Sequence, residues 1–262
     1  MSLTKYLPSP SDQVVMGIES IAFVGDVHGR LDCLIDCVRT AALHARGTIV
    51  QVGDFWMYQD QRILTKFERQ MGIIENQYGV PIDVHFIDGN HEDYSKIDPH
   101  GDVPHQFSPR MTYHPRGTVF DVHGVSIGCF GGAHSHDVAA DPSMNWKGRR
   151  EGKNWWPNEV PQPHDVEKAV NMGHVDILVT HEAPMSTFDI IRTDDTTPQE
   201  VSSRKDVQSV LDATTPYWMF HGHHHTPYTT MRGFTRITGL ACNAEEGSVA
   251  AIFYGDGVEF LM

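Results

Sequence analysis

The feature that most constrains the fold is a short apolar run ending in Gly-Asp, found at residues 20–26 (SIAFVGD) and again at 48–54 (TIVQVGD). Between these runs, apolar residues recur at helical spacing up to Gly47, a glycine that predicts the end of a helix. A polar helical stretch at 60–78 and a third β-rich run at 81–91 (PIDVHFIDGNH) follow. The resulting β-α-β-α-β order predicts parallel strands joined by right-handed crossovers.

The second half of the chain has a different order of elements. Residues 118–132 (TVFDVHGVSIGCFGG) predict a hairpin that turns at His123-Gly124. Together with the first half, this pattern predicts an α/β fold with two sheets flanked by helices. The remaining expected elements are helices at 164–173 and 199–212, strands at 175–181 and 217–223, and antiparallel strands in the tail with a turn at 255–257.

The length of the chain favours a single domain. The chain has 262 residues, of which 40% are hydrophobic, which is enough for one sizeable core. We expect a single domain over residues 1–262, with a loose N-terminal leader at 1–18. Residues 133–165 are rich in Pro, Gly, Asn, Trp and charge, with little periodicity. Because structureless loops of this length usually serve a function, we expect a functional loop or cap there.

Charge and cysteine usage exclude several classes of protein. The formal net charge is −14, with 34 acidic against 20 basic residues, so extensive nucleic-acid or anionic-membrane binding is not expected. No apolar run approaches the ~18 residues of a membrane span, and the N-terminus lacks a signal-peptide profile. We interpret the four cysteines as reduced, which favours a cytoplasmic protein.

Metal-capable side chains follow five of the expected strands. Sites in α/β sheets form beyond the carboxyl ends of strands, so these groups should converge. Each has a plainer interpretation: Asp-x-His as a helix cap, Gly-Asp and Asn-His as turn chemistry, and a lone histidine as a hydrogen-bonded loop residue. Their joint occurrence at strand ends favours a metal site. The five groups are Asp26-Val27-His28, Gly53-Asp54, Gly89-Asn90-His91-Glu92, His181 and Gly222-His223-His224-His225.

This order of motifs (D-x-H, G-D, G-N-H-[DE], H and G-H-x-H) resembles that of the calcineurin-like metallophosphoesterases over roughly residues 20–240. The resemblance implies a four-layer α/β/β/α sandwich of two mixed sheets flanked by helices. It also implies a dimetal site at the carboxyl ends of the strands. The implied cofactors are two divalent ions, for which Mn²⁺ is favoured, although imidazole and carboxylate ligands also suit Fe, Zn or Ni.

The resemblance assigns the ligands residue by residue. Asp54 would bridge the two ions and screen their mutual repulsion, while the other ligands divide between them. His221 and His224 receive no ligand role. The first ion would take Asp26, His28 and His225, and the second would take Asn90, His181 and His223.

The same resemblance implies a reaction. A hydroxide bridging the two ions would attack phosphorus in line, and His91 would protonate the leaving oxygen as general acid. Glu92 and Asp93 are alternative partners to orient that histidine. Asp54 and His91 are therefore the expected catalytic residues.

Protein Ser/Thr phosphatases share GDVHG and GNHE with this chain but differ at two places. They carry an arginine before GNHE, where this chain has Asp88, and an Asp-Arg-Gly after the second motif, where this chain reads GDFWMYQDQR. The arginines that grip phosphate in that branch are absent at these positions. Arg30 is the candidate substitute.

The stretch at 131–159 resembles a GGA-x-S-x-D … G-x-x-WWP-x-E pattern of bacterial and phage members of the family. It contains a basic cluster (Lys147, Arg149, Arg150 and Lys153) and two tryptophans that could stack on a base. Alternatively, the tryptophans anchor the loop and the basic residues are solvated. The candidate substrate-binding residues are Arg30, Asn90, His91, Arg149, Arg150 and Trp155.

These observations favour a phosphodiesterase for a nucleotide-type phosphoester. A phosphomonoesterase for proteins or small molecules, and a metal-dependent nuclease, share the same site. A nuclease would need a long basic groove, which the acidic composition disfavours. A non-enzymatic metal-binding scaffold is disfavoured because both Asp54 and His91 are present.

Overall fold

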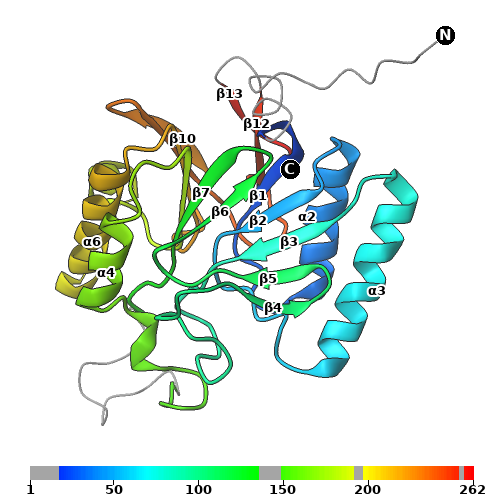
Figure 1. The fold of residues 1–262 in the computed structure, drawn as a ribbon, viewed down its shortest axis with the longest axis horizontal. Coiled ribbons are helices and arrows are strands. Elements are labelled where there is room, and N and C mark those ends of the chain that lie inside the picture. The colour runs from blue at the N-terminus through cyan, green and yellow to red at the C-terminus, as the bar shows by residue number, and fades with distance from the viewer. Residues whose placement is uncertain (1–17, 136–148, 192–196, 254–256) are drawn as a thin grey trace.

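The computed structural model of the protein describes residues 18–135, 149–191, 197–253 and 257–262. Two sheets lie face to face in this part of the chain (Figure 1). The seven-stranded sheet has the order β13 (Gly257–Phe260), β12 (Val249–Phe253), β1 (Ile21–Val24), β2 (Thr48–Gln51), β3 (Asp83–Phe86), β5 (Met111–Tyr113) and β4 (His105–Ser108). The six-stranded sheet has the order β10 (Tyr228–Arg232), β11 (Thr235–Gly239), β9 (Trp218–His221), β8 (Ile177–Thr180), β7 (Val125–Phe130) and β6 (Thr118–Val122).

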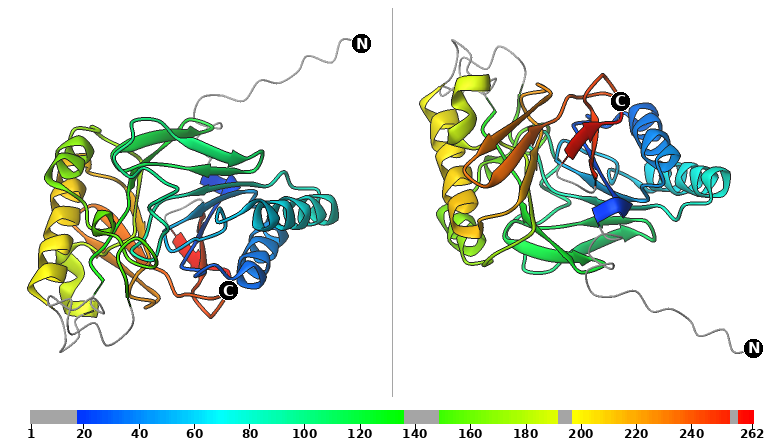
Figure 2. Two further views of the ribbon diagram at one scale, coloured as in Figure 1. Left: turned by 90° about the horizontal axis from the view of Figure 1, so that it is seen from below. Right: turned by 90° about the horizontal axis from the view of Figure 1, so that it is seen from above.

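Helices cover the outer face of each sheet, which gives four layers (Figures 1 and 2). One pair packs on the seven-stranded sheet and another on the six-stranded sheet, while short helical turns lie in the connections. The helices are α2 (Leu31–Leu43), α3 (Gln61–Tyr78), α4 (Pro163–Val170), α5 (Phe188–Ile191) and α6 (Pro198–Thr214), with 3-10 turns η2 (Pro157–Glu159) and η3 (Met185–Thr187). The expected four-layer α/β/β/α fold with two mixed sheets is confirmed.

Three apolar clusters fill the three interfaces between the layers, and strand β1 shows how the sequence divides between them. Ala22 and Val24 point toward α2 and α3, whereas Ile21 and Phe23 point toward the second sheet. This alternation follows from the two-residue period of a strand. The Phe23 ring stacks on Phe220 of the opposite sheet, with centroids 3.6 Å apart. A third cluster lies under α4 and α6.

Parallel pairing places the functional turns at a common edge of each sheet. Strands β1, β2 and β3 pair in parallel, and so do β7, β8 and β9. The remaining strands are added mainly in antiparallel orientation, including the predicted hairpin of β6 and β7, in which Val122 pairs with Val125. The carboxyl ends of the parallel strands therefore lie together within each sheet.

The prediction that Gly47 stops the first helix is wrong. Helix α2 ends at Leu43, and Ala45 rather than glycine adopts the left-handed conformation, with φ of 58°. A Cβ at position 47 would lie 2.1 Å from the carbonyl oxygen of Pro81, so this glycine permits a close approach of two chain segments. Helix α3 ends as the glycine rule describes, at Gly79 with φ of 69°.

Two expectations fall partly outside the described residues. Most of the predicted leader (1–18), the centre of the insert at 133–165, and part of the turn at 255–257 are not described. The described end of the insert contains η2 and the start of α4. Among the described residues, no helix has both the length and the apolar character needed to cross a membrane.

Candidate metal centre

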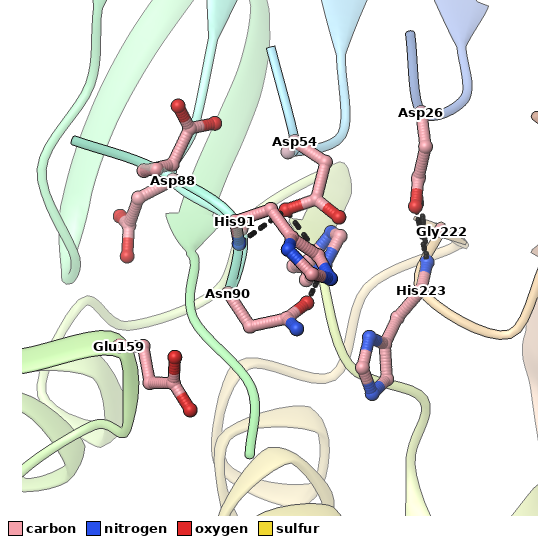
Figure 3. Close-up of polar contacts among 12 residues, drawn as sticks. Asp26, Asp54, Asp88, Asn90, His91, Glu159, Gly222 and His223 are labelled. Carbon is pink, nitrogen blue, oxygen red and sulfur yellow. Dashed lines mark hydrogen bonds and ion pairs between the residues drawn. The ribbon is translucent and has the colours of Figure 1, made fainter. Parts of the chain in front are cut away.

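The five motif-bearing turns converge where the carboxyl ends of the two sheets meet (Figure 3). Asp26, Asp54 and Asn90 follow β1, β2 and β3 of the seven-stranded sheet. His181 follows β8 of the other sheet, and the HGHHH segment begins at the end of β9. The centre is thus assembled from both sheets, as the motif order predicts.

The first group of candidate ligands is Asp26, His28 and His225. The His225 Nε2 lies 3.0 Å from the Asp26 Oδ2, and one ligand atom from each of the three residues lies within 4.8 Å of the others. The His28 Nε2 lies 3.5 Å from the Asp54 Oδ2. One oxygen of Asp54 therefore faces the group predicted for the first ion.

The other oxygen of Asp54 faces the second group. The Asp54 Oδ1 lies 3.5 Å from the His181 Nε2, which lies 3.0 Å from the Asn90 Oδ1. The His223 ring lies beside that of His181, with centroids 5.1 Å apart. Asp54 thus lies between the two groups, in the place that the sequence assigned to a bridging ligand.

The contacts of His181 provide a test of whether a cation fits. Its Nδ1 donates to the carbonyl oxygen of Val52 at 2.8 Å, so the Nε2 of the neutral ring carries a lone pair. That lone pair faces the Asn90 Oδ1 and the Asp54 Oδ1, which are also acceptors. Converging acceptors repel unless a positive charge lies among them, so these residues fit a bound cation.

Backbone strain marks the same turns. His28, Asp54, His223 and His225 all have positive φ, between 46° and 64°. For non-glycine residues, such conformations cost on the order of 1–3 kcal/mol each and cluster at functional sites.

Glycines beside the ligands make room for them. A Cβ on Gly89 would lie 2.2 Å from the Asp54 Oδ1, and one on Gly222 would lie 2.0 Å from the Asp26 Oδ1. The motif glycines are therefore needed for the two candidate ligand carboxylates to fit.

The electrostatics also favour positive charge at this place. Burial opposes the charged form of His28, but the hydrogen bond and charge of Asp54 and the charge of Asp26 raise the pKa of His28 to about 9. Burial likewise opposes ionisation of Asp54, yet the charges of His181, His28 and His91 hold the pKa of Asp54 well below its usual range. Buried carboxylates that stay ionised require nearby cations, which protons or metal ions can supply.

Comparison with known proteins decides the family. The sequence model of the calcineurin-like phosphoesterases matches residues 19–227. The chain belongs to this family. It is therefore a metal-dependent phosphoester hydrolase, and the family depends on two metal ions. No curated protein is significantly similar in sequence.

The solved structure of TT1561 shares the fold at low sequence identity, and two further solved structures show a weaker similarity. The protein TT1561 of Thermus thermophilus is 13% identical, covering 92% of this chain and 96% of that chain, with a TM-score of 0.57. Phosphopantetheinyl hydrolase from Mycobacterium tuberculosis is 12% identical, covering 91% and 97%, with a TM-score of 0.49. A dimetal phosphatase from Danio rerio is 13% identical, covering 90% and 94%, with a TM-score of 0.46.

His91, the expected general acid of this phosphoesterase, faces the metal centre. Its backbone N–H donates to the Asp54 Oδ1 at 2.8 Å (Figure 3). Its ring lies 6.0 Å from that of His28. Its Nδ1 lies 2.9 Å from the Arg149 Nη1. The sequence assigned Arg149 to substrate binding, and in the structure it lies against His91, the expected general acid.

The carboxylates expected to orient His91 make other contacts. Glu92 is buried and accepts hydrogen bonds from the Phe55 N–H and the Tyr58 hydroxyl, both at 2.7 Å. Burial raises the pKa of Glu92 to about 8. Asp93 caps the following turn by accepting from the N–H of Ser95 at 3.1 Å.

Two residues that the sequence interpretation missed hold Arg149 in place. Ser135 accepts from the Arg149 Nη2 at 3.0 Å and from the Asn90 Nδ2 at 2.9 Å. The Ser135 N–H donates to Glu159 at 2.9 Å, and Glu159 lies 3.8 Å from Arg149. Both residues belong to the GGA-x-S and WWP-x-E segments, so the insert pattern was the available signal.

Asp88, which occupies the position where Ser/Thr phosphatases carry an arginine, forms an ion pair in the protein interior. Its Oδ2 accepts from the Nε and Nη2 of Arg116, at 2.9 and 2.6 Å, and both side chains are fully buried. Arg116 also donates to the carbonyl oxygens of Asn158 and Glu159, at 2.8 and 3.1 Å. Asp88 and Arg116 therefore hold the end of the insert that carries Glu159.

Glu182 is a further residue that the sequence interpretation missed, although it directly follows His181. It is buried, and its carboxylate lies 2.6 Å from the His224 Nε2 and 3.7 Å from the His223 Nε2. Burial opposes its ionisation, but these two histidines hold the pKa of Glu182 well below its usual range. His224, which received no ligand role, therefore pairs with a carboxylate beside the metal centre.

The other candidate substrate contacts are spread over the surface. Arg30 pairs with Asp32 at 3.0 Å, with more than half of its side chain exposed. Arg150 is exposed and Trp155 is half-buried, while Lys147 lies outside the described residues. Trp156 packs against the core beside Tyr94, which supports the anchoring interpretation for this tryptophan.

Proposed function

We propose that this phosphoesterase is a phosphodiesterase acting on a nucleotide-type substrate, with a pair of Mn²⁺ ions as the favoured cofactor. The observation that carries the proposal is the meeting of the five motif turns around Asp54, with Arg149 of the insert against His91. Membership of the family establishes phosphoester hydrolysis as the reaction. The insert at 133–165 is the segment from which we infer the kind of phosphoester.

Each side chain has a separate role in holding the ions. Asp26, His28 and His225 would bind one ion, and Asp54 would bridge to the other. The remaining ligands of the second ion would be Asn90, His181 and His223. When bound, such a pair supplies Lewis-acid charge and an activated water at neutral pH.

His91, the candidate general acid, would face the leaving oxygen through its Nε2. A guanidinium group can only donate hydrogen bonds, so the Nδ1 facing Arg149 must be an acceptor. The proton of the neutral ring then lies on the Nε2, which would donate a hydrogen bond to the leaving oxygen as negative charge develops there. Arg149 would thereby select the tautomer that the reaction needs.

The local charge supports a diester over a monoester. A diester carries one negative charge, whereas a monoester carries close to two at neutral pH. The positive charge of buried Arg149 is partly offset by Glu159 at 3.8 Å, whose pKa burial raises to about 7, so the insert adds less than one full positive charge for binding the substrate. The half-buried Trp155 offers a ring that could stack on a base.

A rate comparison tests the proposal. With added Mn²⁺, bis-p-nitrophenyl phosphate should be hydrolysed faster than p-nitrophenyl phosphate, and Asp54→Ala should be inactive with lowered metal content. A preference for the monoester would overturn the diester assignment and direct attention to Arg30 as a phosphate clamp. Full activity of Asp54→Ala would overturn the bridging role.

A further inference from the structure

A second group of metal-capable side chains lies outside the catalytic centre. His100 is in the loop between β3 and β4, while His164 and Asp165 are in the first turn of α4. The His100 Nδ1 lies 2.8 Å from the Asp165 Oδ1 and 3.0 Å from the His164 Nε2. The His164 Nε2 lies 3.3 Å from the same Asp165 oxygen.

These separations suit a small divalent cation. Ligand bonds of about 2.0–2.1 Å in a tetrahedral zinc site place neighbouring ligand atoms roughly 3.3 Å apart. The three observed distances of 2.8, 3.0 and 3.3 Å are at or slightly below that value. Two imidazole nitrogens and a carboxylate oxygen are also a ligand set that zinc accepts.

The second carboxylate oxygen of Asp165 is held by other groups. The Asp165 Oδ2 accepts from the backbone N–H of Gln162 at 2.7 Å and lies 3.3 Å from the Arg116 Nη1. Such hydrogen bonds fix the direction of a ligating carboxylate. Burial opposes ionisation of Asp165, but the bonds from His100 and Gln162 and the charge of Arg116 lower its pKa.

We propose that His100, His164 and Asp165 form a third divalent-cation site, with zinc as the favoured ion and one position open to solvent. The His164 side chain is 60% exposed, so an ion can reach the site without opening the core. The ion would fasten the loop at 98–102 to α4, where Lys168 already pairs with Asp102 at 3.0 Å. Because Asp165 also lies against Arg116, the ion would be connected through Asp165 to the buried ion pair of Arg116 and Asp88.

The competing arrangement is a hydrogen-bonded triad that shares a proton and binds no metal. Zinc counting separates the two. The parent protein, His164→Ala and the matched control His44→Ala would be stripped with a chelator, saturated with Zn²⁺ and desalted before metal analysis. His44 is an exposed histidine at the end of α2.

We expect His164→Ala to retain one zinc equivalent fewer than the parent and His44→Ala to match the parent. Loss of a ligand should weaken this site by more than about 100-fold, because losing even an outer-shell partner costs 10–100-fold. Equal zinc content in His164→Ala and the parent would overturn the proposal and leave the triad. Because the readout is metal content, it is independent of phosphodiesterase activity.

Discussion

Replacing Arg116 with methionine tests how strongly the insert is tied to the interior. Methionine fills much of the same space but leaves Asp88 and Asp165 without their buried cation. It also removes the donors to the carbonyl oxygens of Asn158 and Glu159. Breaking a buried ion pair by removing one partner costs about 3–5 kcal/mol, so we expect the free energy of unfolding to fall by about 4 kcal/mol.

The assay is urea denaturation at neutral pH in the presence of a chelator, so that bound metal does not contribute. Arg110→Met is the matched control, because Arg110 also pairs with two carboxylates, Glu68 at 2.8 Å and Glu75 at 2.9 Å. Those three side chains are 22–35% exposed, and exposed pairs contribute about 0.2–1 kcal/mol each. Arg110→Met should therefore lose about 1 kcal/mol.

A second variant separates the two causes of the loss. Adding Asp88→Asn to Arg116→Met removes the buried charge that was left unpaired, so part of the stability should return. A loss no larger in Arg116→Met than in Arg110→Met would refute the reasoning. It would mean that the interior charge of Asp88 is balanced by groups other than Arg116.

Three further predictions concern the site, the metal ligands and pH. Arg149→Met should lower kcat by about 10–100-fold with metal content retained, because His91 loses the contact that selects its tautomer; steady-state kinetics and metal analysis check this. The control Arg62→Met, at an exposed arginine of helix α3, should match the parent. Glu182→Gln should weaken metal binding by about 10–100-fold, measured by dialysis against chelator, because the carboxylate no longer supports His223. Burial lowers the pKa of His114 to about 3. Below pH 6.5 this histidine is therefore protonated in the unfolded chain but stays neutral in the native state, so the free energy of unfolding falls as the pH falls toward 3. When the pH is lowered from 7 to 5, the free energy of unfolding of His114→Gln, measured by urea denaturation, should fall by about 2 kcal/mol less than that of the parent. Equal decreases would contradict the lowered pKa of His114.

The sequence predicted the fold and the convergence of the motif turns for a physical reason. Each motif is a short contiguous segment that directly follows an apolar strand, and parallel strands bring their carboxyl ends together. Position along the chain therefore determined position in space for Asp26, Asp54, Asn90 and His181. The left-handed backbone conformations in these turns could be predicted only from the glycines next to them in the sequence.

The contacts of the insert could not be predicted in the same way. Arg149 reaches His91 across 58 residues of sequence, and Arg116 reaches Asp88 across 28, so no local pattern connects them. The Gly47 prediction failed because helix α2 ended earlier, while the glycine was needed for close packing against Pro81. Tertiary packing, rather than local preference, decided each of these positions.

The candidate metal ligands come from both sheets, and this has a consequence for the lifetime of the protein. Asp26 and His225 lie side by side although 199 residues separate them in sequence. The complete ligand set therefore exists only in the folded chain, so metal binding stabilises that state, by about 4 kcal/mol at a thousandfold excess over Kd. A cell starved of the metal would contain less of this enzyme as well as a less active one, because the apo form unfolds and is degraded more often.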